Sequence, residues 1–131
     1  MKMSTYAHSF QIDTQGFADI RDITGEVSEA VLKSGLDSGV CVVFVPGSTA
    51  GVTTIEFESG ALADLKEAIA RLVPEGAAYA HDARWGDGNG FSHVRAALLG
   101  PSLSLPFRDR VLITGTWQQI VLVDFDNRPR Q

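Results

Sequence analysis

The segment from Tyr79 to Arg95 holds most of the side chains in this sequence that could do chemistry. It contains His81 and His93, two of the three histidines in the chain, among aspartates, arginines, an asparagine and a tryptophan. Neutral imidazole can coordinate a zinc-like metal or act as a general base near neutral pH. A neighbouring carboxylate such as Asp82 can orient the ring or complete a site. Three interspersed glycines permit the backbone angles with which a loop closes around a small ligand. This segment is therefore the first candidate for a ligand or metal site.

The spacing of the two histidines leaves a second interpretation open. The twelve-residue step from His81 to His93 matches neither a zinc-finger pattern nor the i, i+4 pair of a metal-binding helix. Both rings can equally be polar loop residues, with Asp82 and Asn89 capping turns. The mixture of imidazole, carboxylate, guanidinium and indole groups in one glycine-rich segment is what favours a site.

A second candidate follows an apolar run and extends from Pro46 to Glu56. Ser48 and Thr49 lie there between glycines, and such a turn can present hydroxyl and backbone N–H groups to an anion. The segment lacks the lysine of a Walker motif, so an ordinary turn is the alternative interpretation.

Composition restricts the partners and the compartment. The 131 residues carry 11 basic and 16 acidic side chains, a net charge of −5. The densest basic spot, Arg128-Pro129-Arg130, is expected to be a frayed tail, so we expect no nucleic-acid binding. Cys41 is the only cysteine and lies in an apolar run, which predicts a buried, inert thiol and a reducing compartment. No apolar run approaches the ~20 residues of a membrane span. We therefore expect a cytoplasmic protein without membrane contact.

Hydrophobic periodicity predicts one domain over residues 1–131, with more strand than helix. The expected class is α+β: a mostly antiparallel, sandwich-like sheet with two main helices packed on it. Residues 75–92 show no clean period and are expected to be a long loop, and loops of this length in a compact domain are usually functional or disordered. The predicted strands cover residues 6–12, 40–45, 52–57, 93–99, 103–107 with 111–114, and 117–125, and the predicted helices cover about 24–34 and 60–73.

Several motifs together resemble the YjbQ-like family, a largely uncharacterised family whose members are described as secondary thiamine-phosphate synthases. The family pattern runs through most of the chain, from about residue 6 to residue 126. The matching segments are Pro46 to Thr53 with Glu56, Leu72-Val73-Pro74, Tyr79-Ala80-His81-Asp82, Asn89 to Gly100, and Gly115 to Ile120.

Two departures from the family pattern concern histidines. The first family histidine falls on Gly47, and the first histidine of the Asn-x-His-x-His block falls on Phe91. Only His81 and His93 of the set remain. The resemblance therefore implies a divalent metal, Zn²⁺ or Mg²⁺, that this pair would bind with Asp82 or Glu56. Alternatively, the pair serves only as hydrogen-bond partners to an anionic ligand.

The resemblance also implies a reaction and an assembly. The reaction joins a pyrimidine diphosphate to a thiazole phosphate and releases pyrophosphate. His81, His93 and Arg95 would then be catalytic, because cationic and N–H donor groups stabilise the charge that builds on pyrophosphate. The ligand-binding residues would be Ser48, Thr49, Glu56, Asp82, Trp85 and Asn89.

The implied assembly is a homotrimer with the cleft where subunits meet. Trp85 and Arg95 can equally be a packing aromatic and a surface ion-pair partner. A trimer that binds a phosphorylated small molecule or a metal without turnover, and a structural trimer with a vestigial cleft, are the competing hypotheses.

Overall fold

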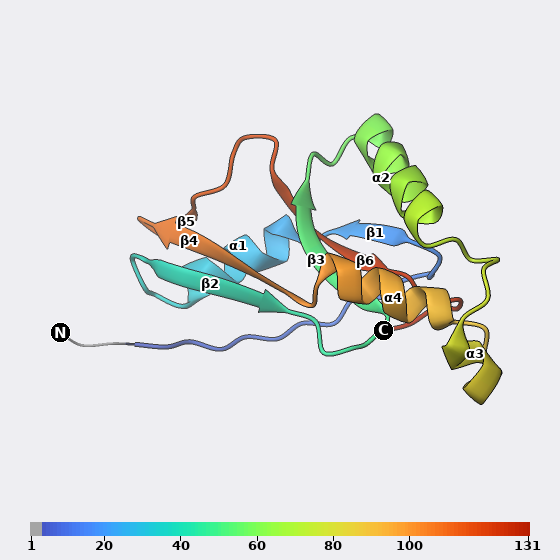
Figure 1. Cartoon of the computed structure of the whole chain (residues 1–131). Coiled ribbons are helices and arrows are strands. Elements are labelled where there is room, and N and C mark those ends of the chain that lie inside the picture. Colours follow the sequence, from blue (N-terminus) through green and yellow to red (C-terminus); the bar gives the residue numbers. More distant parts are fainter. Residues whose placement is uncertain (1–3) are drawn as a thin grey trace.

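Among the residues that the structure describes, two antiparallel three-stranded sheets are accompanied by four helices (Figure 1). The structure is a computed structural model that describes residues 4–131. Its elements are β1 (Asp19–Asp22), α1 (Thr24–Lys33), β2 (Gly39–Phe44), β3 (Ala50–Ile55), α2 (Ser59–Leu72), α3 (Ala80–Trp85), α4 (Gly90–Leu99), β4 (Ser102–Arg108), β5 (Val111–Leu112) and β6 (Gln119–Asp124). The predicted α+β class with a mostly antiparallel sheet arrangement is confirmed. No helix among the described residues is long and apolar enough to cross a bilayer.

The first sheet has the order β1-β6-β3, so β6 is its central strand. Ala50 of β3 pairs with Asp124 of β6, and Ile55 pairs with Gln119 at the other end. Ile120 and Val121 are both fully buried, although successive residues of a strand point to opposite faces. Both faces of β6 are therefore covered, as its apolar sequence predicted.

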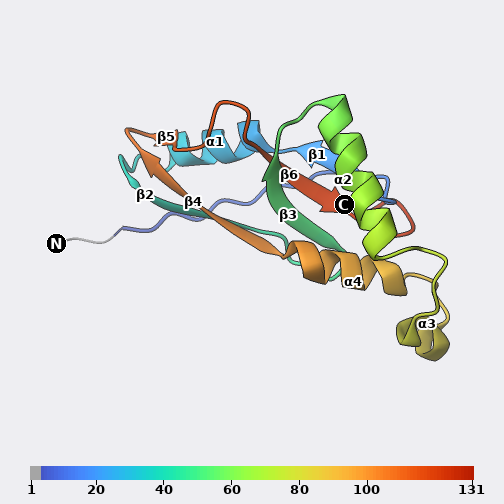
Figure 2. The ribbon, with the colours of Figure 1, turned by 45° about the horizontal axis from the view of Figure 1, so that its top comes forward.

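The two sheets build two neighbouring clusters of the core. Beside the β2-β4-β5 sheet, Val27 and Val31 of α1 pack against Phe107 of β4. Beside the β1-β6-β3 sheet, Leu65 and Ile69 of α2 pack on the cluster that includes Phe125. Figures 1 and 2 show the same arrangement from two directions, with α1 beside one sheet and α2 beside the other. Each helix packs its apolar stripe against one sheet, because both elements must bury their apolar faces.

The segment from 93 to 99, predicted to be a strand, is part of helix α4. Phe91, Arg95 and Ala96 of this helix are buried while Val94 and Leu98 are exposed, which is a helical period. A short apolar run does not distinguish a buried strand from a helix, so the strand prediction was wrong. Ser92 fastens the start of α4 to the core, because its hydroxyl donates to the Phe125 carbonyl at 2.5 Å.

Other corrections concern the chain before β1 and the loop before α4. Residues 6–12 alternate as a strand would, yet they lie extended and pair with no strand among residues 4–131. A strand needs a partner, and the one backbone bridge of this arm pairs Thr14 with Arg130 at its end, beyond residues 6–12. The predicted loop of residues 75–92 contains the short helix α3, and Asp19–Asp22 forms a strand that its polar sequence did not predict.

Candidate functional site

A polar pocket of about 470 Å³ opens where the loop after β2 meets the start of α4. Its wall combines the turn from Val45 to Ala50 with Asn89 and His93 of the α4 region. Asp124 at the end of β6 and the segment from Arg128 to Gln131 complete it. The pocket therefore brings together the two segments that the sequence singled out, Ser48–Thr49 and Asn89–His93.

The two histidines of the Tyr79–Arg95 segment lie against each other at the edge of this pocket. His81 stands on α3 and His93 on α4, and their ring centroids are 4.4 Å apart with a 42° tilt. The two helices and the turn between them therefore bring into contact two rings that lie twelve residues apart in the sequence. The two histidines that the sequence analysis named as candidates are therefore neighbours in the fold.

Two carboxylates face the His81 ring. The Nδ1 atom of His81 lies 3.3 Å from Oδ1 of Asp87 and 3.5 Å from Oδ1 of Asp82. One ligand atom from each of these three residues lies within 4.8 Å of the other two. One imidazole and two carboxylate oxygens are a suitable donor set for a Zn²⁺-type ion, whereas Mg²⁺ prefers oxygen ligands alone.

Gly90 allows α3 and α4 to approach closely enough to form this cluster. A Cβ atom at Gly90 would lie 2.6 Å from Cβ of Tyr79 and 3.1 Å from Oδ1 of Asp82. The Gly90 N–H also donates to that Asp82 oxygen at 2.9 Å. The glycine therefore places Asp82 beside His81, and any side chain there would force the helices apart.

Behind the pocket lies a buried network centred on Asp126. Its carboxylate is fully buried and accepts from Nδ2 of Asn89 at 3.1 Å, the Asn127 N–H at 2.8 Å and Nε of Arg130 at 2.5 Å. Burial opposes ionisation, but these hydrogen bonds outweigh it and hold the pKa of Asp126 below its usual range. Asp126 therefore stays charged and fixes the orientation of Asn89.

The same network holds the segment near Gln131 in place. Thr14 and Arg130 exchange two backbone hydrogen bonds, at 2.8 and 3.1 Å, and the Thr14 hydroxyl donates to the buried Asp124 carboxylate. The prediction of a frayed tail at Arg128–Arg130 is therefore wrong. The ion pair of Arg130 with Asp126 and its backbone bridge with Thr14 hold this segment, so Arg128 and Arg130 both line the pocket.

Five predicted site residues do not line the pocket. His81 contacts the lining residues His93 and Asp87, and Asp82 lies beside His81, whereas Arg95, Trp85 and Glu56 belong to other surroundings.

Arg95 is buried, donates to the Val73 carbonyl at 3.0 Å and stacks over Phe91, and burial lowers its pKa. Trp85 is 66% exposed, and the Arg84 guanidinium lies over its ring.

Glu56 follows the far end of β3. β3 begins at Ala50, which lines the pocket. Glu56 comes six residues later, and a strand rises about 3.3 Å per residue, so Glu56 lies roughly 20 Å from Ala50. The structure therefore does not bring Glu56, Trp85 or Arg95 together with His93.

The sequence reasoning did not single out Asp87, Asp124, Asp126, Arg128 and Arg130 as site residues. Asp87 was discoverable, because it lies within the same glycine-rich segment as both histidines. The others depend on pairings between segments far apart in the chain, such as Thr14 with Asp124 and Asn89 with Asp126. No local pattern marks them.

The comparisons with known proteins agree with the motifs. The family model described as "UPF0047 protein YjbQ-like" matches residues 8–131. The chain belongs to the UPF0047 (YjbQ-like) family. A UPF0047 protein of Mycobacterium bovis is 42% identical over 96 residues, which cover 72% of this chain and 74% of that protein. One from Methanothermobacter thermautotrophicus is 35% identical over 124 residues, covering 95% and 85% of the two chains.

Solved structures of UPF0047 relatives share the fold. A protein of unknown function from Sulfolobus solfataricus matches with a TM-score of 0.82 and 32% identity, covering 90% of this chain and 88% of the other. An uncharacterised family member from Clostridium acetobutylicum matches with the same score and identity, covering 90% and 92%. The family predicted from the motifs is thus confirmed.

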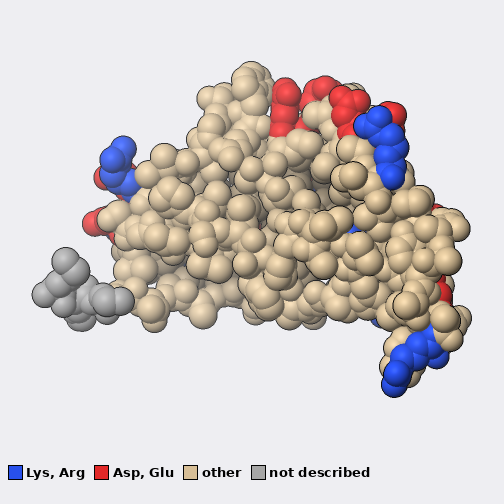
Figure 3. All heavy atoms as spheres, viewed as in Figure 1, with Lys and Arg blue, Asp and Glu red and all other residues tan. Residues whose placement is uncertain are grey.

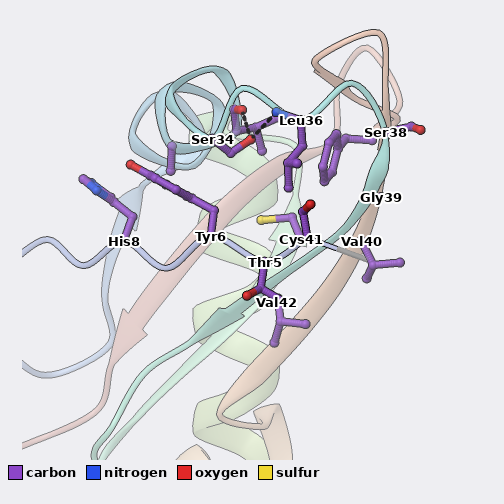
Figure 4. Close-up of a pocket in the computed structure, with 14 residues that line it drawn as sticks. Thr5, Tyr6, His8, Ser34, Leu36, Ser38, Gly39, Val40, Cys41 and Val42 are labelled. Atoms are coloured by element: carbon purple, nitrogen blue, oxygen red, sulfur yellow. Dashed lines mark hydrogen bonds between the residues drawn. The ribbon is translucent and has the colours of Figure 1, made fainter. Parts of the chain in front are cut away.

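This UPF0047 chain has a second cavity, of about 350 Å³, between the arm before Thr14, α1 and β2. Figure 4 shows Tyr6 and His8 on the arm and the Cys41 sulfur on β2. Burial raises the pKa of the Cys41 thiol, which therefore stays protonated near neutral pH. The predicted inert thiol agrees with this, but Cys41 is half-buried at the cavity wall and not fully buried as predicted.

Proposed function

We propose that the pocket beside His81 and His93 binds a phosphorylated small molecule. The observation that carries this proposal is that His93, whose ring lies against that of His81, and the Ser48–Thr49 turn line one cavity. A volume of about 470 Å³ is typical of sites for small ligands. The reaction we propose joins a pyrimidine diphosphate to a thiazole phosphate, as in thiamine-phosphate synthesis.

The residues at the pocket suit the charge changes of that reaction. As the new bond forms, the bond to pyrophosphate breaks and negative charge builds on the leaving group. The hydroxyl groups of Ser48 and Thr49 and an N–H of His93 can donate hydrogen bonds to its oxygens. Arg95 contributes nothing to this step in our account, because its guanidinium is occupied by Val73 and Phe91.

We further propose a divalent metal held by His81, Asp82 and Asp87, with His93 beside it. The donor set favours a Zn²⁺-type ion, and Asp87 takes the place that the sequence interpretation gave to Glu56. When bound, the ion would supply positive charge for the phosphate oxygens. The Gly90 N–H holds one carboxylate of the set in position.

Binding without turnover is the second candidate function. Two observations favour it: Gly47, where the family pattern has a histidine, lines the pocket, and Arg95 points into the core. A pocket with one histidine pair and no free cation from α4 can hold an anion and still lack the groups that accelerate its transfer. Turnover decides between the two functions.

A homotrimer is the proposed assembly, with the uncharged face of the molecule as its interface. Figure 3 shows a broad face over β2 and α4 with almost no charged atoms, which lie at its rim. Val40, Val42 and Phe44 on the outer side of β2 are 60–67% exposed, and Leu98 of α4 is 69% exposed. An exposed apolar surface of this kind is typical of a protein interface.

The test is a thermal-shift panel on metal-stripped protein with Zn²⁺, Mg²⁺, pyrophosphate and thiamine phosphate. We expect the melting temperature to rise with Zn²⁺ and pyrophosphate, because ligands that bind the folded state stabilise it. The rise should disappear in His93→Ala and persist in His8→Ala, whose histidine lies on the arm at the other cavity. If no ligand shifts the wild-type protein, the metal and phosphate proposals fail. Assays of thiamine phosphate formation then separate enzyme from binding protein.

A further inference from the structure

Strand β2 is an unprotected edge of its sheet. Within the described part of the chain it pairs only with β4, so its other edge carries backbone N–H and C=O groups that no strand takes up. Its sequence, Gly39–Phe44, contains neither a charged residue nor a proline, which are common means of keeping a free edge from pairing with another chain. On its outer face Val40, Val42 and Phe44 are 60–67% exposed. An apolar edge of this kind is expected to be covered by a further strand.

The extended arm of residues 4–13 is a strand without a partner. Tyr6, His8 and Phe10 lie on one side of it, and the His8 ring centroid is 6.4 Å from that of Tyr6 and 6.5 Å from that of Phe10. Residues 4–11 are all exposed, and residues 5–13 form no backbone–backbone hydrogen bond with any other described residue. The arm therefore has the alternation and the free backbone groups of a strand that adds to the edge of a sheet.

The arm does not pair with β2 of its own chain. The cavity of about 350 Å³ lies between them, with Ser4 to His8 on one wall and Ser38 to Val42 on the other (Figure 4). The arm is anchored only at its far end, where Ile12 packs against the core and Thr14 bonds to Arg130. At about 3.3 Å per residue, residues 4–11 span about 26 Å, which is longer than the six residues of β2. The arm is thus long enough to lie along the whole β2 edge of another copy.

The outer side chains of β2 and α4 are too few to hold copies of the chain together. Phe44 is 60% exposed, which for a phenylalanine is about 120 Å². Val40, Val42 and Leu98 are smaller and 63–69% exposed, so the four side chains offer at most about 500 Å². A stable interface buries about 800 Å² on each partner. A further segment must therefore take part, and the exposed arm has a suitable length.

We propose that the β2 edge of each copy is covered by the arm of a neighbouring copy, so that the arms are exchanged around the trimer. The inference rests on the proposed homotrimer and names the segment that builds its interface. A closed trimer needs a head-to-tail contact between two different surfaces of the chain. The arm and the β2 edge are such a pair, because the backbone of one supplies the hydrogen bonds that the other lacks.

A proline scan of the arm, read by analytical ultracentrifugation of the full chain, tests the proposal. The variants are Ala7→Pro, His8→Pro, Ser9→Pro and Phe10→Pro, each compared with valine at the same position, which keeps the N–H and suits a strand. Successive N–H groups of a strand point to opposite edges, so only every second proline should remove a hydrogen bond to β2. We expect those two to weaken the trimer about tenfold and the other two to change it little. A contact made by side chains alone would show no such alternation.

Disulfide cross-linking identifies the copy that supplies the arm. Cys41 of β2 is the only cysteine of the chain, so Tyr6→Cys or Ala7→Cys adds one defined partner on either side of the arm. Oxidation of one of these variants should join separate chains on a non-reducing gel. The same variant with Cys41→Ser is the control, and it should stay uncross-linked.

Each contrary result has its own meaning. A trimer that tolerates all four prolines would overturn the exchange and leave the outer face of β2 as the interface. Disulfides within single chains would show that each arm closes over its own β2, which also overturns the exchange. A wild-type chain that sediments as a monomer would refute the exchange and the homotrimer together, while the ligand tests of the pocket would stand unaffected.

Discussion

Replacing Asp126 with asparagine should lower the free energy of unfolding more than any single substitution at the surface. The asparagine Oδ1 can still accept from Asn89 and the Asn127 N–H. The Nδ2 of the new asparagine, however, would face Nε of Arg130. In the wild-type protein this Nε donates to the Asp126 carboxylate at 2.5 Å. The substitution exchanges a charge-assisted hydrogen bond for two opposed donors in a fully buried site.

The expected magnitude follows from that exchange. Losing a hydrogen bond to a charged group and leaving a buried donor unpaired should lower the free energy of unfolding by about 2–4 kcal/mol. For a chain of this length, at about 4 °C per kcal/mol, the melting temperature should fall by roughly 8–16 °C. Urea unfolding followed by circular dichroism measures the first quantity, and calorimetry measures the second.

The effect should depend on pH. Because the folded state lowers the pKa of Asp126, its carboxylate stabilises the fold fully above the ordinary aspartate pKa. That contribution is lost as the pH falls through the lowered value, so the gap between wild type and Asp126→Asn should narrow below about pH 4. A gap that stays constant into strong acid would contradict the assignment of a charged Asp126.

Asp37→Asn is the matched control, because Asp37 also accepts from an arginine Nε, that of Arg110 at 3.2 Å, but its side chain is 82% exposed. It should change the unfolding free energy by less than about 0.5 kcal/mol. If Asp126→Asn costs no more than Asp37→Asn, the buried network does not hold the pocket wall as argued.

Three further substitutions probe the site and the surface. Gly90→Ala should cost about 1–3 kcal/mol in urea unfolding, because its Cβ would overlap Tyr79, whereas Gly76→Ala, with open space, should be near neutral. Gly47→His should raise Zn²⁺ affinity in a competition assay with a zinc-binding dye, since a Cβ there meets nothing within 4 Å at the pocket wall; an unchanged affinity would contradict this. Val42→Glu should dissociate the proposed trimer in analytical ultracentrifugation, while Leu72→Glu, on α2 and 75% exposed against 63% for Val42, should not; identical sedimentation of both variants would argue against the β2 interface.

The orientation of Arg95 depends on the element that carries it. On the strand predicted for residues 93–99, His93 and Arg95 would point to the same face. On the helix that forms, a two-residue step turns by about 200°, and the Arg95 side chain points into the core. The family motif places the residues correctly in the sequence, but it does not determine which way each one faces.

Local composition predicted the site only where its members lie close together in the chain. The segment from His81 to His93 was identified because one glycine-rich stretch holds both rings and their carboxylates. Asp124 and Arg128 were not identified, because the pairing of Thr14 with Arg130 brings them to the pocket. Contacts between such distant segments depend on the whole fold, which periodicity does not specify.

The most direct test of the account is an NMR titration of the histidine side chains. The chain has three histidines, so ring ¹⁵N–¹H correlations report on His8, His81 and His93, with His8 as the internal control. Addition of Zn²⁺, and separately of pyrophosphate, should move the signals of His81 and His93 together and leave those of His8 in place. Equal shifts at all three rings, or none at His81 and His93, would contradict a ligand site at the α3–α4 pair.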